Sequence, residues 1–410
     1  MDDTQFADIA TWISNAGLSG QDETAMVTEF CTRLVALGLP LTRAQVFIDT
    51  LHPVHAGLGY YWQNASLSGA VKGETVATEY GLAVEGAALE RWRRSAFYHM
   101  IESGSAALRR RLTNESGAEF PFLGELFAAG MTDYIAVIDR FGADAIIGEM
   151  DGVYSSWVSD RPQGFTDEQI AMLRRLTPCF ALAIKSATLG RIARTLVETY
   201  LGRDPGKRVL KGSITRGQST SIEAVLWFSD LHSYTRICDR VQPEEIIPFL
   251  NDYAETVIAA IHEAGGDVLK LIGDGTLAMF TGEDRSSACR AALNAAQKTL
   301  DLVDELKQRR LAGGLPATDL YLGLHPGEVV YGNFGSRERL DFTVVGPAVN
   351  EVSRIAALCR LVDQPILVSS AFHAALGPEQ DNLVSVGRYA LRGVERPQDL
   401  FTLARPRQSV

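Results

Sequence analysis

The sequence has few cysteines and none in a paired spacing. The five cysteines among 410 residues stand singly, as Cys31, Cys179, Cys238, Cys289 and Cys359. Because no two of them form a Cys-x-x-Cys unit, the sequence offers neither a zinc-finger spacing nor a dithiol redox pair. An odd number of cysteines in a chain of this length is typical of a reducing compartment.

The sequence also lacks a long apolar run and an excess of positive charge. No stretch approaches the ~20 apolar residues that span a bilayer, and the acidic start MDDTQFADIATW does not resemble a signal peptide. We therefore expect a cytoplasmic protein without a membrane span. With 39 Lys and Arg against 50 Asp and Glu, the chain is a poor candidate for binding nucleic acid or an anionic membrane. A nucleotide substrate remains compatible, since metal ions bridge carboxylates to phosphates.

The length of 410 residues predicts two or three domains. In the first half, hydrophobic periodicity predicts a helix over 21–38, a helix near 88–101 and a polar segment over 102–119. Strands are predicted from apolar alternation over the ranges 44–53, 57–63, 132–141, 145–151 and 153–160. Thr166 and Gln169 form a capping-box pattern that opens a helix at Asp167, reaching about Leu201.

This order of elements resembles a GAF-type sensor domain over about residues 20–188, and SSWVSDRPQGFTDEQIAMLRRL is similar to the closing strand and helix of such domains. The resemblance implies an unknown small-molecule or protein input. His52 and His55 flank Pro53 in an expected turn, so a surface position is favoured over haem or metal ligation. A role for Cys31 in attaching a chromophore is favoured even less than haem or metal ligation by these histidines.

The long helix and the segment after it separate two patterns. Leu182, Leu189 and Leu196 recur every seven residues, which fits either a dimeric linker or the last helix of the first domain. The Gly-, Ser- and basic-rich stretch 202–221 indicates a connector. We therefore expect a sensor domain over 1–188, a helical linker and connector over 189–221, and a catalytic domain over 222–405.

Two aspartates in the second half are candidates for metal binding. In EAVLWFSDLHSYT a buried strand delivers Asp230, and the turn Leu231–Thr235 can present backbone N–H groups to phosphate oxygens. In DVLKLIGDGTLAMF a β-hairpin places Asp274 on the turn. Taken alone, Asp274 is most simply explained as a residue that favours the turn conformation. Together, two carboxylates on adjacent strand ends can hold two divalent ions about 3.5–4 Å apart.

A later strand and helix carry three more polar candidates. In LDFTVVGPAVNEVSRIAALCR, Thr343 lies on the strand, and Asn350 and Arg354 share one helical face because they are four residues apart. An amide and a guanidinium aimed together suit a ribose and a phosphate in a transition state. Taken alone, such a pair of polar residues usually lies on the solvent-exposed face of a helix.

FSDLHSYT, LKLIGDGTLAMF, GEVVYGNFGS and DFTVVGPAVNEVSR resemble, in order and spacing, the motifs of class III adenylate and guanylate cyclases. The resemblance covers about residues 222–404. It implies an α+β fold, in which a catalytic domain with a βαββαβ, ferredoxin-like palm core follows the α/β GAF-like domain. It also implies a homodimer with active sites between two catalytic domains, ATP as substrate, and two divalent metal ions, Mg or Mn.

The same resemblance implies roles for individual residues. Asp230 and Asp274 match the metal-binding aspartates, with the Leu231 carbonyl as an extra ligand. The residues expected to contact the phosphates are Ser233, Tyr234, Thr235 and Arg392. Ser233 and Tyr234 stand where Gly and Phe are usual, and Arg392 stands near the usual Lys. These departures put the loop conformation in question, because Gly relaxes backbone demands.

The remaining roles concern the base and the transition state. Lys270 matches the purine-reading lysine, Thr343 falls where many bacterial adenylyl cyclases have Thr, and Asn350 with Arg354 match the pair that stabilises the transition state. Guanylyl cyclases usually have Glu and Cys at the positions of Lys270 and Thr343, so the resemblance implies ATP. A cyclase-like regulatory module is the non-catalytic alternative, but such modules typically lose these groups. Gly265-Gly266-Asp267 superficially matches a diguanylate cyclase motif, but Val-Leu-Lys follows it.

Overall fold

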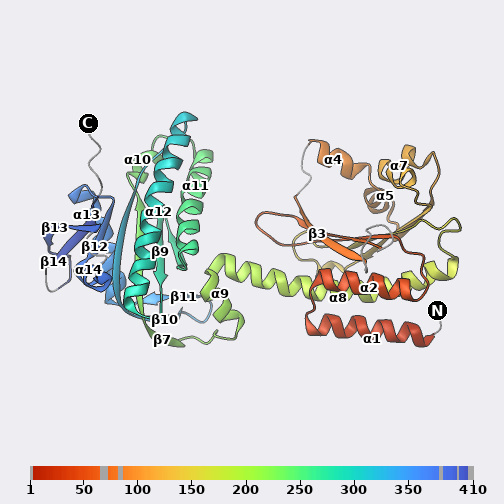
Figure 1. Ribbon diagram of the computed structural model, residues 1–410, viewed down its shortest axis with the longest axis horizontal. Coiled ribbons are helices and arrows are strands. Elements are labelled where there is room, and N and C mark those ends of the chain that lie inside the picture. The colour runs from red at the N-terminus through yellow and green to blue at the C-terminus, as the bar shows by residue number, and fades with distance from the viewer. Residues whose placement is uncertain (1–2, 65–72, 82–85, 378–381, 395–396, 405–410) are drawn as a thin grey trace. The chain divides into compact units, whose positions relative to one another are not determined.

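The computed structural model describes residues 3–64, 73–81, 86–377, 382–394 and 397–404 (Figure 1). The chain divides into two compact units, Met1–Leu196 and Val197–Val410. The boundary falls within helix α8 (Asp167–Leu201), which supplies residues to both. Each unit has its own sheet and its own core.

The first unit is built on a six-stranded antiparallel sheet with the order β3-β2-β1-β6-β5-β4. Its strands are β1 (Arg43–Asp49), β2 (Gly57–Gln63), β3 (Glu74–Tyr80), β4 (Ala107–Arg111), β5 (Asp133–Arg140) and β6 (Gly152–Ser159). The helices are α1 (Asp3–Ser19), α2 (Glu23–Ala36), α4 (Gly86–Arg93), α5 (Ala96–Ser103), α6 (Ser116–Glu119), α7 (Pro121–Ala128) and α8, with the short 3₁₀ turn η1 (Ala143–Ala145). Side chains of α1, α2 and α8 share one buried cluster with the sheet, which includes Phe30, Trp157 and Phe180.

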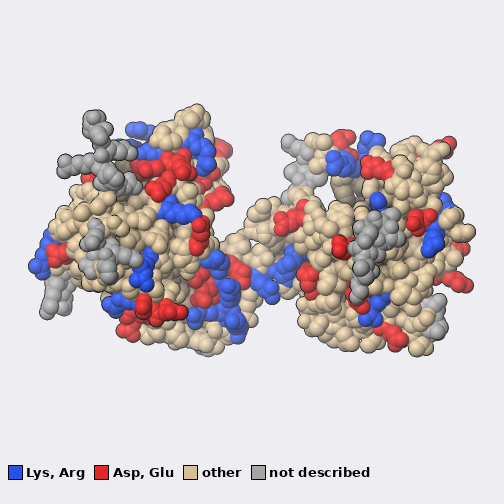
Figure 2. All heavy atoms as spheres, in the orientation of Figure 1, with Lys and Arg blue, Asp and Glu red and all other residues tan. Residues whose placement is uncertain are grey.

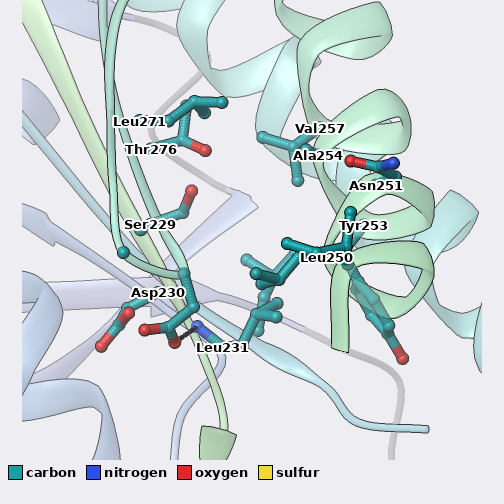
Figure 3. Close-up of a pocket in the computed structure, with 15 residues that line it drawn as sticks. Ser229, Asp230, Leu231, Leu250, Asn251, Tyr253, Ala254, Val257, Leu271 and Thr276 are labelled. Carbon is teal, nitrogen blue, oxygen red and sulfur yellow. Dashed lines mark hydrogen bonds between the residues drawn. The ribbon is translucent and has the colours of Figure 1, made fainter. Parts of the chain in front are cut away.

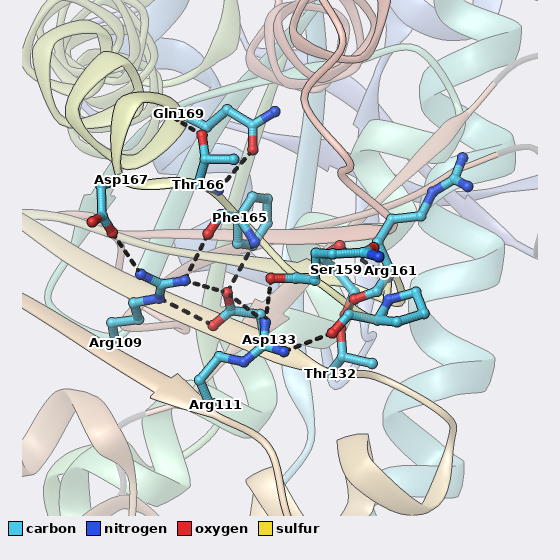
Figure 4. Close-up of polar contacts among 12 residues, drawn as sticks. Arg109, Arg111, Thr132, Asp133, Ser159, Arg161, Phe165, Thr166, Asp167 and Gln169 are labelled. Carbon is cyan, nitrogen blue, oxygen red and sulfur yellow. Dashed lines mark hydrogen bonds and ion pairs between the residues drawn. The ribbon is translucent and has the colours of Figure 1, made fainter.

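The start of α8 is fixed by a buried carboxylate (Figure 4). Asp133 on β5 is fully buried, and its Oδ2 accepts hydrogen bonds from Arg109 Nη2 at 2.9 Å and from the Phe165 amide at 3.0 Å. Arg109 also donates to Asp167, the first residue of α8, at 3.1 Å. Removing one partner of such a buried charge typically costs about 3–5 kcal/mol, so this cluster holds β4, β5 and α8 together.

The capping box at the start of α8 is confirmed. The Thr166 amide donates to Gln169 Oε1 at 2.9 Å, and the Gln169 amide donates to Thr166 Oγ1 at 3.2 Å. The helix runs to Leu201 as expected. Of the three heptad positions, Leu182 is 68% exposed, whereas Leu189 and Leu196 pack against the core of the first unit.

Three expectations for the first unit need correction. The helix expected near 88–101 is two helices, α4 and α5. The polar segment 102–119 contains the strand β4, whose arginines are paired with Asp133 and Glu119. The strand expected over 145–151 does not form, because β5 and β6 pair directly with each other and leave this segment as their connection, with only an isolated bridge between Ile147 and Met150.

The second unit has a sheet in the order β13-β14-β12-β10-β7-β9-β8, with β11 paired to β10. Its strands are β7 (Ser219–Leu231), β8 (Asp267–Ile272), β9 (Gly275–Phe280), β10 (Leu320–Gly335), β11 (Leu340–Val345), β12 (Ile366–Ser369), β13 (Leu383–Tyr389) and β14 (Gln398–Leu403). Its helices after α8 are α9 (Arg203–Leu210), α10 (Tyr234–Cys238), α11 (Pro243–Glu263), α12 (Arg285–Ala312), α13 (Pro347–Val362) and α14 (Ser370–Leu376). The predicted βαββαβ core is confirmed as β7-α11-β8-β9-α12-β10, with the four strands in the order β10-β7-β9-β8.

The central strand β7 separates two apolar layers, because successive side chains of a strand point to opposite faces. Val225 and Trp227 pack in the cluster that holds α11 and α12. Ala224 and Leu226 pack in a second cluster with Val352 of α13. Both faces of the sheet are therefore covered, and the polar residue at the end of β7, Asp230, emerges at its edge.

The predicted connector over 202–221 contains a packed helix. Gly202 ends α8 with a φ of +91°, and a Cβ at this position would lie 2.4 Å from the Val268 carbonyl oxygen of β8. Arg203 donates a hydrogen bond to the Gly266 carbonyl at 3.0 Å. Helix α9 is thus anchored to the start of β8, and only a glycine permits the close approach before it.

Among the described residues, no helix is both long and apolar enough to cross a membrane. Basic and acidic side chains are interspersed on the face of the molecule shown in Figure 2.

Candidate active site

Two carboxylates meet at the end of β7. The β8–β9 hairpin pairs Ile272 with Gly275, which leaves Gly273 and Asp274 as its two-residue turn. Gly273 has a φ of +63°, as the first position of such a turn requires. Because β9 also pairs with β7, the turn lies beside Asp230. Asp274 Oδ2 accepts a hydrogen bond from the Leu231 amide at 3.1 Å, drawn as a dashed line in Figure 3.

The proximity of the two carboxylates changes the ionisation of Asp230. Partial desolvation, a hydrogen bond to Asp274 and repulsion from its charge raise the pKa of Asp230 to about 7. Two carboxylates placed side by side in this way form a site at which positive charge is favoured.

The donor set fits a magnesium-type ion. Mg²⁺ is usually held by one or two carboxylates, with waters and substrate phosphates completing the octahedron. Asp230 and Asp274 supply such a pair, and among the described residues no group of three or more His, Cys, Asp or Glu side chains could form a closed protein cage. The observed role of Leu231 is its amide, which positions Asp274.

A cavity of about 180 Å³ lies beside the two carboxylates, between the hairpin and α11 (Figure 3). Leu250, Ala254 and Val257 of α11 contribute to its apolar lining, and Asp230 and Asp274 contribute to its polar lining. The sequence predicted the carboxylates but not this cavity, which depends on how α11 packs against the hairpin.

The turn after Asp230 adopts a conformation that usually requires glycine. Ser233 has a φ of +56°, in the left-handed region, and its Oγ lies 3.3 Å from His232 Nε2. A non-glycine residue in this region costs about 1–2 kcal/mol. Serine in place of the usual glycine at position 233 therefore leaves the left-handed turn in place but adds backbone strain.

The other two loop residues differ in their accessibility. The Tyr234 ring stacks on Phe249 of α11, and its contact with Cys238, together with desolvation, raises the pKa of its hydroxyl to about 12. Thr235 is exposed. Tyr234 therefore anchors the turn to α11, and Thr235 is the loop side chain open to a ligand.

The candidate purine-reading residues lie on β8 and β11. Lys270 forms an ion pair with Asp341, two residues before Thr343 on β11. Because residues two apart on a strand share a face, Thr343 lies on the same face of β11 as the Lys270 partner. Asp341 is a residue that the sequence reasoning missed, and the period-two spacing in LDFTVV was the signal that could have found it.

Helix α13 presents the candidate transition-state pair. Pro347 occupies the first turn, where its missing N–H is tolerated. Asn350 is exposed and Arg354 is half-buried. A Cβ added at Gly393 would lie 3.4 Å from Arg354 Nη1, so the guanidinium packs against the turn that carries Arg392. The structure thus brings the Arg354 guanidinium to the turn that carries Arg392.

The structure does not bring all candidates to one place within a chain. Leu271 lines the cavity beside Asp230 and Asp274, whereas the preceding residue, Lys270, is directed to Asp341 on β11. Among the described residues, those lining this cavity include none of Lys270, Thr343, Asn350 and Arg354.

The first unit offers no equivalent site at the residues singled out from its sequence. Cys31 is fully buried, and burial raises the pKa of its thiol, which disfavours the reactive thiolate. The rings of His52 and His55 stack with centroids 3.6 Å apart, and His55 Nδ1 lies 3.3 Å from Glu79. This contact pairs the two histidines with each other and with a carboxylate at the end of the sheet.

Comparison with known proteins identifies a family match in the second unit. Residues 218–404 match the family model for the adenylate and guanylate cyclase catalytic domain. An adenylate cyclase of Anabaena cylindrica is 35% identical over 159 residues, which cover 39% of this chain and 32% of that protein. Adenylate cyclase 1 of Rhizobium meliloti (strain 1021) is 29% identical over 154 residues, covering 36% of this chain and 23% of that protein. The chain therefore spans about a third or less of the length of these two relatives.

Solved structures that match part of this chain include the adenylyl cyclase CyaB from P. aeruginosa, at 22% identity and a TM-score of 0.42, covering 47% of this chain and 99% of that chain. The guanylyl cyclase Cya2 has 26% identity and a TM-score of 0.40, covering 46% of this chain and 97% of that chain.

Proposed function

We propose that this chain is an adenylate cyclase that forms 3′,5′-cyclic AMP and pyrophosphate from ATP, because residues 218–404 match the family model for the adenylate and guanylate cyclase catalytic domain. The observation that carries the proposal is the pair Asp230 and Asp274, joined through the Leu231 amide at the end of a buried strand. In the reaction, the ribose 3′-hydroxyl attacks the α-phosphorus in line, and pyrophosphate leaves from the opposite side.

Asp230 and Asp274 would hold two divalent ions, Mg²⁺ or Mn²⁺. When bound, such ions acidify the attacking hydroxyl and neutralise phosphate charge. The chain itself positions the carboxylates through the Leu231 amide, while the left-handed turn at Ser233 directs the chain into α10. Thr235, with the backbone of this turn, would contact the phosphates.

The remaining candidates would recognise the base and the developing charge. The Lys270 ammonium is a donor, which suits N1 of adenine, whereas N1 of guanine carries a proton and would leave the lysine unpaired. Thr343 would supply a second polar contact. Asn350 would orient the ribose, and Arg354 and Arg392 would stabilise the charge that develops on the phosphates.

The arrangement of these groups supports a site shared between two chains. Lys270 and the metal-binding carboxylates point to different sides of the hairpin. Ile247, Leu271 and Ile272, beside the cavity, are 62%, 52% and 48% exposed, an apolar surface that a second chain would cover. In a two-fold dimer, each site would combine Asp230 and Asp274 of one chain with the other groups of its partner.

The first unit would act as a GAF-like regulatory domain. Its last helix, α8, continues into the catalytic unit, where Gly202 and α9 contact the strand β8 that carries Lys270. A small-molecule or protein input to the first unit would therefore change turnover by altering the placement of two catalytic units, since sites built across an interface are sensitive to displacements of about 1 Å.

Activity measurements with purified protein test the proposal. The full chain should convert ATP to cyclic AMP with Mg²⁺ or Mn²⁺, and GTP should be the poorer substrate. Asp230→Asn and Asp274→Asn should each remove nearly all turnover without loss of fold, whereas Glu305→Gln, an exposed carboxylate on α12, should leave it unchanged. A preference for GTP would identify a guanylyl cyclase, and a chain inactive with both nucleotides would favour a regulatory module.

A further inference from the structure

A buried polar cluster lies beneath α13. His325 on β10 is 7% exposed, with its Nδ1 2.9 Å from Ser369 Oγ and its Nε2 3.6 Å from Glu351 Oε2. The Glu351 side chain is only 14% exposed, although it directly follows Asn350 on α13. The other carboxylate oxygen of Glu351 accepts a hydrogen bond from the Gln398 amide of β14.

Ser369 Oγ caps α14 by accepting from the Phe372 amide at 3.2 Å, which leaves its hydroxyl proton available to His325 Nδ1. In the tautomer that accepts this proton, the neutral ring carries its own proton on Nε2, on the side of Glu351. Burial lowers the pKa of His325, which favours this neutral form, while Glu351 partly opposes the shift.

Glu351 therefore contacts two different elements of the fold. Through His325 it connects α13 to β10, which pairs with β7, the strand that carries Asp230. Through Gln398 it connects α13 to the β13–β14 hairpin. The connection within that hairpin carries Arg392 and Gly393, and Gly393 is the residue against which Arg354 packs.

A carboxylate with these links controls both the rotation of α13 and its distance from the hairpin. The two neighbours of Glu351 on the helix, Asn350 and Arg354, are the candidate transition-state groups. A rotation of α13 would move both of them, and a shift of the hairpin would move Arg392 away from Arg354. The Glu351 carboxylate is largely shielded from solvent, and leaving it unpaired there would be strongly unfavourable.

We propose that Glu351 is a positioning residue of the cyclase, which aligns Asn350, Arg354 and the turn that carries Arg392 through its contact with His325 and the hydrogen bond that it accepts from Gln398. The inference rests on the proposed cyclase function. It predicts a loss in kcat rather than in substrate affinity, because the groups that Glu351 aligns are expected to act in the transition state.

Glu351→Gln tests the link with little change in volume. The amide of the variant has one acceptor oxygen and one NH₂ group, which must face either Gln398 Nε2 or His325 Nε2, so either the hydrogen bond from Gln398 or the contact with His325 is lost. We expect kcat with ATP to fall about tenfold or more, since a 1 Å displacement of reacting groups can cost roughly 100-fold. KM for ATP should stay within about twofold, as expected for a transition-state interaction.

A reciprocal exchange provides the rescue. Glu351→Gln combined with Gln398→Glu again pairs an amide donor with a carboxylate acceptor, now in the reverse direction, and keeps an acceptor for His325. This double variant should recover most of the missing kcat. A general loss of stability would not be restored in this way. If Glu351→Gln folds poorly, Gln398→Leu tests the same prediction. This variant removes the hydrogen bond from Gln398, leaves the contact between Glu351 and His325 in place, and should also lower kcat.

The measurement is steady-state kinetics of the full-length chain, with thermal unfolding as a check of folding and Glu305→Gln as the matched control. Unchanged kcat in Glu351→Gln would overturn the inference, as would a double variant no more active than the single one. A wild-type chain that forms no cyclic nucleotide would instead overturn the proposed function on which the inference rests.

Discussion

The carboxyl of Asp49 should make the first unit less stable as the pH rises. Asp49 ends β1, where desolvation and the nearby charges of Asp151 and Glu149 raise its pKa to about 6, although a hydrogen bond from Tyr80 at 2.7 Å opposes the shift. In the unfolded chain an aspartate has a pKa of about 3.9. The folded state therefore holds its proton to a higher pH than the unfolded state does.

The sign and size of this effect on the free energy of unfolding follow from proton linkage. A group whose pKa is higher in the folded state contributes stability that is fully present below its pKa in the unfolded chain, and that stability is lost as the pH rises through its pKa in the folded state. A shift of about 2 units corresponds to roughly 3 kcal/mol in total, of which about 1.4 kcal/mol falls between pH 5 and pH 7.5. Solvent screening of this partly exposed group makes these values upper limits.

Asp49→Asn removes the ionisation while keeping an acceptor for Tyr80. Urea unfolding of the wild type and the variant at pH 5 and pH 7.5 gives the difference directly. The variant should gain stability relative to the wild type on going from pH 5 to pH 7.5, by up to about 1.4 kcal/mol. A difference in unfolding free energy between variant and wild type that is the same at both pH values, or that shifts in favour of the wild type at pH 7.5, would refute the assignment of a raised pKa to Asp49.

Three further outcomes are expected. Lys270→Glu combined with Thr343→Cys should weaken the use of ATP by about 1–3 kcal/mol in kcat/KM for each hydrogen bond to the base that is removed and should admit GTP, whereas unaltered selectivity would exclude both residues from base recognition. Ser233→Gly should relieve the strain of a positive φ, about 1 kcal/mol before the extra entropy of glycine in the unfolded chain is subtracted, so a substantially destabilised variant would show that the side chain of Ser233 has a different role. Deleting residues 1–188 should change the turnover per catalytic site at saturating protein concentration, and identical kinetics would count against regulation by the first unit.

Local patterns predicted those parts of the fold that depend on neighbouring residues. The start of α8 followed from Thr166 and Gln169, and β2 followed from its apolar and aromatic run. Strand β4 was missed because its arginines look like a solvated segment, although two of them pair with the buried Asp133 from another strand. The strand expected over 145–151 failed because no neighbouring strand is available to pair with it, which only the topology reveals.

In the candidate site, too, local features could be predicted from the sequence and contacts between distant residues could not. The hairpin turn with Asp274 and the helix with Asn350 and Arg354 could be predicted from spacing, because each is local. The ion pair between Lys270 and Asp341, and the buried contact of Glu351 with His325, join residues far apart in the sequence and could not. Whether two chains share a site is a property of their association, which no single-chain pattern encodes.

The central claim, a cyclase whose two sites are each built from both chains, is tested most directly by mixing two inactive variants. Asp230→Asn and Arg354→Ala should each be nearly inactive as homodimers. After subunit exchange and random pairing, half of the dimers are heterodimers, in which one site carries both changes and the other carries neither. The account predicts that the mixture recovers about a quarter of the wild-type cyclic AMP production. A mixture that stays inactive after demonstrated exchange would contradict it.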